Sequence, residues 1–149
     1  MDTEDRLITL LHRLRRLGVE NPPTDNFQAS PAQIMLLEWI AAHPGCRAQD
    51  VAEGLGLTSP TVSVGLRRLE KMGLLHRVPH PSDKRALQIF LTAEGERLHQ
   101  QIQALHRLKA RQLLAGLTPD EQETLLTLWE RALQAAEGNS SHAHSSQKP

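Results

Sequence analysis

The stretch that decides the fold covers residues 59–95 and reads SPTVSVGLRRLEKMGLLHRVPHPSDKRALQIFLTAEG. Its first part predicts a helix with Ser59 as its cap and Pro60 in its first turn, where proline is favoured. Gly73 ends this helix. Three apolar side chains at i, i+4 and i+7 predict one buried stripe, made of Val62, Leu66 and Leu69.

Two short runs after this helix predict a β-hairpin. We expect strands over 74–78 and 86–91, joined by the connector PHPSDKR, whose length and prolines give a long tip. The tip carries three consecutive charges, Asp83, Lys84 and Arg85. Charges at a hairpin tip also serve to prevent aggregation, so their presence alone does not assign them a role.

Two further helices are predicted upstream of this stretch. The first opens with Ser30 as cap, Pro31 in the first turn and Gln33 closing a capping box. Its expected buried residues are Ile34, Leu37, Ile40 and Ala41. The second runs from about Ala48 to Leu55, and a short Leu-Gly-Leu turn joins it to the helix after Ser59. This order, two helices and a short turn followed by a hairpin, fits a helix-turn-helix.

In such a unit the second helix enters the major groove of DNA with its first residues leading. The candidate contacts to bases or phosphates on this helix are Ser59, Pro60, Thr61, Ser63, Val64, Arg67, Arg68 and Lys71. The segment from Thr58 to Arg85 contains six Lys or Arg residues and two acidic residues, which gives it a net charge of +4 in a chain of net charge zero. A local basic patch can still hold a polyanion, because salt screens charges more than about 8–10 Å away. The same residues also fit a solvated helix face.

The hairpin and its helix resemble the MarR (multiple antibiotic resistance regulator) family of bacterial winged-helix regulators. The hairpin matches the family pattern at Gly73, Leu74, Arg77, Asp83, Arg85, Leu91, Thr92 and Gly95. The helix matches at Thr61, Val62, Ser63, Leu69 and Glu70. The motifs are specific over residues 48–95, and the order of helices extends the likeness over about 4–137.

This resemblance implies a mainly α fold with a small β-wing, in which a winged helix-turn-helix is flanked by N- and C-terminal dimerisation helices. It implies a homodimeric repressor that binds an inverted repeat in double-stranded DNA and responds to a small-molecule effector. In the wing, Arg77, Lys84 and Arg85 are then candidate DNA contacts. Arg85 would reach a minor groove or a phosphate, and Asp83 would orient its side chain through a charge-assisted bond.

The corresponding domain plan has four parts. We expect an N-terminal dimerisation helix within 1–20, the DNA-binding domain over 30–92, dimerisation helices over 93–137 and a disordered tail over 138–149. Thr92 is expected to cap the first C-terminal helix, and Thr118 with Glu121 to open the second, which ends at about Ala136. The leucine stripes of these helices fit either a dimer interface or an ordinary core.

The helix that follows Ser59, which the resemblance makes the DNA-recognition helix, departs from the family pattern at Val64 and Gly65. Many members carry a basic or bulky polar residue there. Glycine in a helix interior costs roughly 1 kcal/mol relative to alanine. A close approach of the backbone to DNA, or tight packing on a neighbouring helix, would explain it. Val64 could touch a thymine methyl group.

Other classes of function find little support. The sequence lacks a phosphate-binding Gly-rich loop, a nucleophile elbow and an HExxH motif, so we expect no enzyme and no cofactor. Membrane association is not expected, and the single Cys46 fits a buried residue of a cytoplasmic protein. Two histidine pairs, His76 with His80 and His99 with His106, lack further ligands at the usual spacing, so no metal site is predicted. A protein-interaction winged helix, or a metal- or redox-responsive regulator, remains the alternative.

Overall fold

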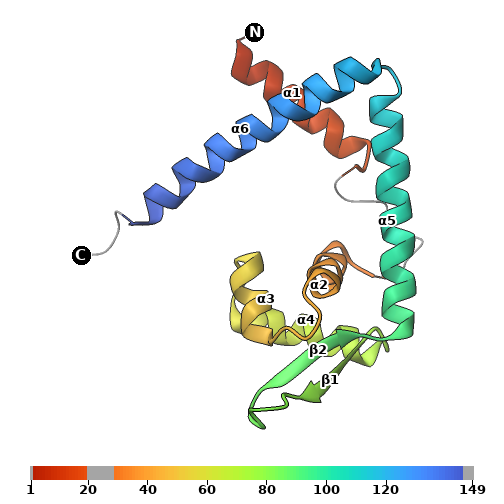
Figure 1. Ribbon diagram of the computed structural model, residues 1–149, viewed down its shortest axis with the longest axis vertical. Coiled ribbons are helices and arrows are strands. Elements are labelled where there is room, and N and C mark those ends of the chain that lie inside the picture. The colour runs from red at the N-terminus through yellow and green to blue at the C-terminus, as the bar shows by residue number, and fades with distance from the viewer. Residues whose placement is uncertain (1, 20–28, 146–149) are drawn as a thin grey trace. The chain divides into compact units, whose positions relative to one another are not determined.

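The computed structural model describes residues 2–19 and 29–145, with side chains up to residue 140. Its helices are α1 (Thr3–Arg16), α2 (Pro31–Ala42), α3 (Ala48–Leu55), α4 (Ser59–Lys71), α5 (Ala93–Leu114) and α6 (Pro119–Ser145). Its strands are β1 (Leu75–Pro79) and β2 (Leu87–Leu91). Figure 1 shows the hairpin between α4 and α5, which confirms the mainly α fold with a small β-wing. The chain divides into two compact units, residues 1–109 and 110–149.

The core of the first unit lies where α2, α3 and α4 meet the hairpin and the start of α5. Its largest fully buried side chains are Leu37, Ile40, Val51, Val62, Leu66, Leu69, Leu75, Ile89 and Ile102. The predicted stripe of α4 is therefore confirmed. On α2 the prediction was wrong at one position, because Ala41 is only half-buried and Leu36 is buried instead. Leu36 turns inward because it packs against Gly65 of α4, which has no side chain to oppose it.

Local capping explains where most helices begin. The Ser30 hydroxyl accepts the N–H of Gln33, and the Gln33 side chain accepts the N–H of Ser30, as predicted. Thr118 and Glu121 form the same reciprocal pair at α6. The cap of α4 is Thr58 rather than the predicted Ser59. Thr58 has extended backbone and its hydroxyl accepts the N–H of Thr61, so Ser59 is already the first helical residue.

The two strands pair antiparallel, with Arg77 opposite Ile89 and Pro79 opposite Leu87. Ile89 also exchanges backbone hydrogen bonds with the α2–α3 connector: its N–H donates to Cys46 O at 2.8 Å, and its carbonyl accepts from Gly45 N at 2.9 Å. These two bonds join the β2 edge of the hairpin to the α2–α3 connector. Cys46 is buried, as expected, and this burial, with Asp50 nearby, raises the pKa of its thiol to about 11.

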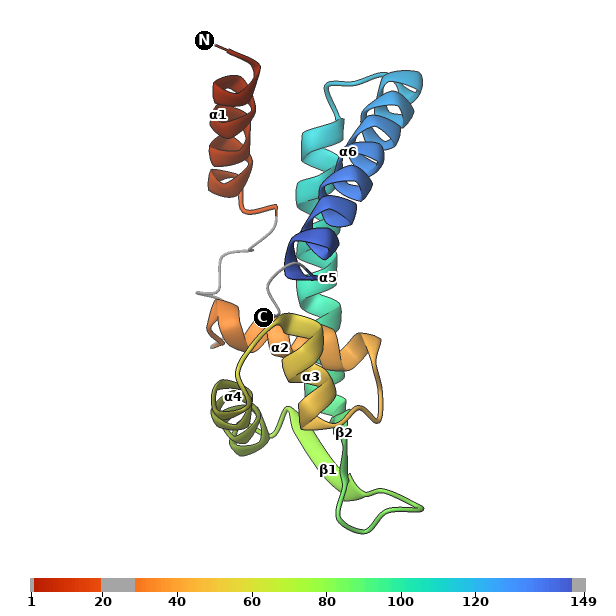
Figure 2. The ribbon, with the colours of Figure 1, turned by 90° about the vertical axis from the view of Figure 1, so that its left-hand side faces the viewer.

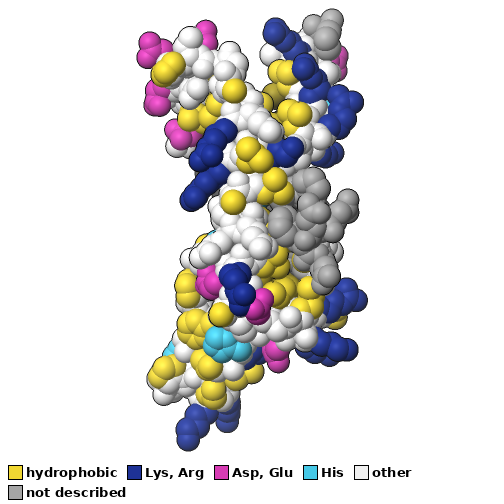
Figure 3. Space-filling view, turned by 90° about the vertical axis from the view of Figure 1, so that its right-hand side faces the viewer, with side chains coloured by type: hydrophobic (Ala, Val, Ile, Leu, Met, Phe, Trp, Pro, Cys, Tyr) yellow, Lys and Arg dark blue, Asp and Glu magenta, His cyan; other side chains and the backbone are white. Residues whose placement is uncertain are grey.

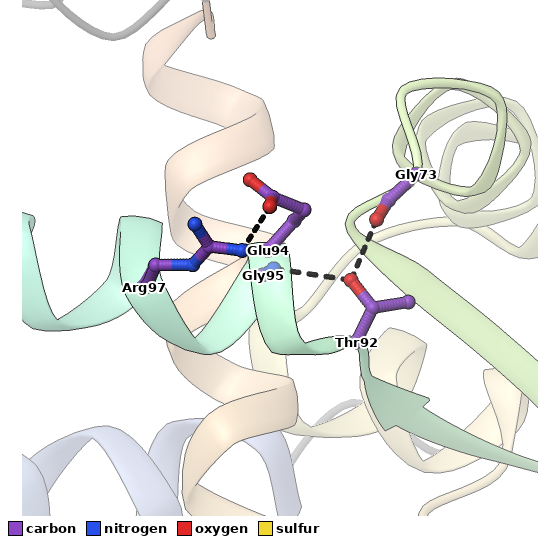
Figure 4. Close-up of polar contacts among 5 residues, drawn as sticks. All are labelled: Gly73, Thr92, Glu94, Gly95 and Arg97. Atoms are coloured by element: carbon purple, nitrogen blue, oxygen red, sulfur yellow. Dashed lines mark hydrogen bonds and ion pairs between the residues drawn. The ribbon is translucent and has the colours of Figure 1, made fainter.

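Thr92 joins the end of the hairpin to two helices. Its hydroxyl donates to Gly73 O at 2.6 Å and accepts the N–H of Gly95 at 3.1 Å, which confirms it as the cap of α5 (Figure 4). A Cβ atom at Gly95 would lie 2.0 Å from Leu74 O, so only glycine fits there. Figure 4 also shows the exposed ion pair of Glu94 with Arg97 on α5.

The last helix extends further than predicted. α6 continues to Ser145, beyond the expected end at about Ala136 and into the segment expected to be a disordered tail. That expectation rested on polar composition, but residues 137–145 contain no proline, so the backbone ladder continues. The Ser140 hydroxyl donates to Ala136 O, a bond that a helix permits. The predicted loop after Gly18 lies mostly outside the described residues, since 20–28 are not described.

Candidate nucleic-acid interface

The exposed side of α4 gathers the residues predicted to contact DNA. Gly56, with φ of +64°, ends α3, and the short turn through Thr58 leads directly into α4. Because the apolar stripe of α4 faces the core, the opposite side is left open. The exposed candidates on this helix are Ser59, Pro60, Thr61, Val64, Arg67, Arg68 and Lys71, while Ser63 is half-buried.

Two open grooves flank this side of α4. One, of about 440 Å³, lies against α3 and is lined in part by Gln49, Ser59 and Ser63. The other, of about 390 Å³, lies against the start of α2 and is lined in part by Pro60 and Val64. The first turns of α4 therefore form a ridge between two hollows, a shape that can enter a groove of the double helix.

The hairpin extends the basic character of this surface beyond α4. Figures 1 and 2 show its loop projecting away from α2 and α3, and Figure 3 shows Lys and Arg side chains at the lower end, where the hairpin lies. Asp83, Lys84 and Arg85 are all exposed in this loop. Among the described residues, no acidic side chain forms an ion pair with Lys84 or Arg85, or with Arg67, Arg68 or Lys71.

Asp83 contacts Arg85 differently from the prediction. Its carboxylate accepts the backbone N–H of Arg85 at 3.0 Å, and its carbonyl accepts the N–H of Ala86 at 3.1 Å. The guanidinium of Arg85 forms no ion pair with Asp83 in the described structure. Asp83 thus shapes the turn that carries Arg85.

Arg77 is the one candidate cation of α4 or the wing that has an acidic partner in the described structure. Its Nε donates to Glu70 Oε2 at 2.8 Å, joining β1 to the last turn of α4. In the sequence, Glu70 stands out only as a match to a family pattern. A contact between residues seven apart across a turn leaves no periodic signal, so the pair could not be predicted from spacing.

Gly65 is explained by packing on a neighbouring helix, one of the two alternatives that the sequence left open. A Cβ atom at this position would lie 2.4 Å from Leu36 Cδ1. The adjacent Val64 is 45% exposed and so remains available for an external contact. Of the two residues that depart from the family pattern, Gly65 therefore serves packing within the protein, and Val64 lies on the surface.

The four histidines considered as possible metal ligands lie in four different settings. His76 stacks on Phe90 across the hairpin, whereas His80 accepts the backbone N–H of Ser82. On α5, His99 contacts Gln103, and His106 Nδ1 lies 3.4 Å from Glu38 Oε1 of α2. Over residues 2–19 and 29–140, no three His, Cys, Asp or Glu side chains are grouped as a metal ion would require.

The described helices include none that is both long and apolar enough to cross a lipid bilayer.

Comparisons with known proteins identify the family. A model of the MarR family matches residues 28–86. YkoM of Bacillus subtilis, an uncharacterized HTH-type transcriptional regulator, is 31% identical over 103 residues, which cover 69% of this chain and 67% of YkoM. For further transcriptional regulators, the matched segment covers 44% of the regulator's own length.

Solved structures agree in fold along most of the chain. The PcaV transcriptional regulator of Streptomyces coelicolor is 32% identical, with a TM-score of 0.63 over 87% of this chain and 96% of PcaV. FabT of Streptococcus pneumoniae, solved in complex with DNA, shares the fold with a TM-score of 0.75 and 20% identity, over 91% of this chain and 95% of FabT. These relatives are regulators and not enzymes, as was expected for this chain. The protein belongs to the MarR family of winged-helix transcription regulators.

Proposed function

We propose that this protein is a homodimeric repressor that binds an inverted repeat in double-stranded DNA and is released by a small-molecule effector. The observation that carries the proposal is the exposed ridge of α4, which continues into a wing whose tip is basic. Hydroxyls and Val64 on the ridge suit base edges. The candidates for phosphate contacts are Arg67, Arg68, Lys71, Arg77, Lys84 and Arg85.

Exposed apolar side chains support the dimer. On α1 they are Leu7, Ile8, Leu10 and Leu17, on α5 Leu108 and Leu113, and on α6 Leu125, Leu126, Leu128, Trp129 and Leu133. Leaving such surface in water costs about 25 cal/mol per Å². A second copy of the chain would cover these faces, and two-fold symmetry would then present two copies of α4 to one operator.

The repressor and effector roles rest on the family. A repressor acts by covering its operator, and an effector can release it only by binding one spacing of the two α4 helices more tightly than the other. We expect a cytoplasmic protein without a cofactor, and both of these remain predictions.

The test is selection of bound sequences from random duplexes, followed by titration at several salt concentrations. We expect an inverted repeat whose half-site centres lie about one helical turn apart. Affinity should fall steeply with salt, and Arg85→Ala should flatten the log–log slope by about 2 for a dimer, at roughly 0.9 per phosphate contact. Glu94→Gln, on α5 and outside the candidate interface, serves as the control. Recovery of a single asymmetric half-site would contradict the dimeric operator, and binding that ignores salt would favour a protein-interaction module.

A further inference from the structure

We infer that Glu70 is a positioning residue for DNA binding, which holds the guanidinium of Arg77 between the recognition helix and the wing and presents it to a phosphate. The inference rests on the proposed function and deepens it.

Glu70 lies on the same side of α4 as two candidate DNA contacts. Ser63, Arg67 and Glu70 follow the i, i+4, i+7 spacing of one helix side. The side chain of Glu70 is 48% exposed. A negative charge beside a phosphate backbone repels it, so Glu70 by itself would weaken the contact for which its neighbours are suited. Any favourable effect of Glu70 on DNA binding must therefore act through the residue that it contacts.

Glu70 touches Arg77 and engages only part of it. The bond runs from Arg77 Nε to Glu70 Oε2 at 2.8 Å. A guanidinium carries five N–H donors in a rigid fork, and the described structure gives the other four no partner in the protein. The side chain of Arg77 is 25% exposed, and its Nη atoms, which have no partner in the described structure, are not among the buried ones. The free donors can bind a phosphate without breaking the ion pair.

Both ends of this ion pair stand on fixed backbone. Arg77 lies in β1 opposite the buried Ile89, and Glu70 lies in the last turn of α4 beside the buried Leu69. A long side chain loses rotamer freedom when it is ordered on binding. Glu70 would remove most of that loss from the binding step, because Arg77 is already ordered in the free protein.

A role as a simple charge and a role in positioning Arg77 predict opposite changes in DNA affinity for Glu70→Gln. If Glu70 acts only as a charge, its neutralisation tightens binding. If Glu70 positions Arg77, binding weakens about three- to tenfold, since Arg77 must then be ordered on the DNA. In an Arg77→Gln background nothing is left to position, so Glu70→Gln should be neutral there or should tighten binding.

The experiment titrates a mixed-sequence duplex of about 30 base pairs with the full-length wild type, the two single variants and the double variant at several salt concentrations. We expect the effect of Glu70→Gln to change sign or vanish between the two backgrounds. Only Arg77→Gln should flatten the salt slope, by about 2 for a dimer. Glu94→Gln, which breaks the exposed pair with Arg97 on α5, is the matched control and should leave binding unchanged.

Three outcomes would overturn the inference. Tighter binding by Glu70→Gln in both backgrounds would reduce Glu70 to a repelling charge. Equal weakening in both would detach its role from Arg77. Two equally weak single variants with unchanged salt slopes would make the pair a brace that contacts no DNA.

A measurement on the free protein separates failure of the inference from failure of the proposed function. The NMR signal of the Arg77 Nε–H should be protected from solvent exchange in the wild type and lose protection in Glu70→Gln. A protected signal in a protein that binds no duplex overturns the proposed function, and the inference with it. An unprotected signal in a wild type that does bind overturns the inference alone.

Discussion

At the scale of single residues, the conformation of the wing tip depends on which group donates a hydrogen bond to the Asp83 carboxylate. Its carboxylate accepts the backbone N–H of Arg85, so it shapes the turn and leaves the guanidinium free. Asparagine has a side-chain oxygen at the same place and can accept the same bond without a charge. The acceptor and the charge of Asp83 can therefore be separated by two substitutions.

We predict that Asp83→Ala weakens duplex binding and that Asp83→Asn does not. The alanine variant loses the acceptor and loosens the turn that carries Lys84 and Arg85. The asparagine variant keeps the turn and removes a negative charge near DNA, so its binding should equal or exceed that of the wild type. Titration of the selected duplex at two salt concentrations measures both.

Ser82→Ala, in the same loop, is the control for this comparison. Asp83→Asn as weak as Asp83→Ala would mean that the charge matters, and would return the carboxylate to the role of partner for the Arg85 side chain.

At the scale of elements, the packing of α4 on α2 depends on Gly65. An added Cβ atom would lie 2.4 Å from Leu36 Cδ1, and Leu36 is itself buried. Overpacking a core costs typically 1–3 kcal/mol, whereas helix propensity returns about 1 kcal/mol when glycine becomes alanine. Since Leu36 is buried and has little room to move, we expect its crowding to match or exceed the gain in helix propensity.

We predict that Gly65→Ala lowers the free energy of unfolding by up to about 2 kcal/mol, the cost of overpacking less the gain in helix propensity, measured by denaturant titration. Combined with Leu36→Ala, the loss should be smaller than the sum of the single losses, because the truncated leucine makes room. Gly138→Ala on α6, where an added Cβ meets nothing within 4 Å, should instead stabilise. Additive losses in the double variant would show that the two residues do not compete for space.

Elements defined by neighbours in sequence could be predicted, and those defined by distant contacts could not. The capping pairs Ser30–Gln33 and Thr118–Glu121 lie three residues apart, so the starts of α2 and α6 followed from the sequence. Ser59 and Thr58 are both good caps, and only the backbone separates them. The inward turn of Leu36 and the pairing of Glu70 with Arg77 depend on the approach of separate elements. The candidate DNA contacts were proposed from spacing and resemblance, and they remain proposals.

At the scale of the whole molecule, the exposed apolar side chains require an explanation. α6 alone exposes Leu125, Leu126, Leu128, Trp129 and Leu133, whereas Thr127, Glu130 and Arg131 are polar. Leu126 and Leu133 are seven residues apart and share one side of the helix. A helix with this pattern is expected to have a partner.

We predict a dimer at micromolar concentration, and a shift to monomer when Leu126→Glu and Leu133→Glu are combined. Two charges on each apolar face would have to be buried unpaired in a dimer. Multi-angle light scattering gives the mass directly. Thr127→Glu adds a charge to the polar side of α6 and should leave the dimer intact. A wild type of monomer mass throughout that range would contradict the dimer and, with it, the inverted-repeat operator.

The contact between Gly65 and Leu36 also bears on how such a protein can evolve. Gly65 admits no side chain without displacing a buried leucine, while Val64, the next residue, is open to solvent. Substitutions at Val64 are therefore expected to cost the fold little, while those at Gly65 are expected to lower its stability. If Val64 contacts bases as proposed, a lineage carrying this helix could change its operator preference at that one position, while the adjacent glycine keeps the packing of the scaffold constant.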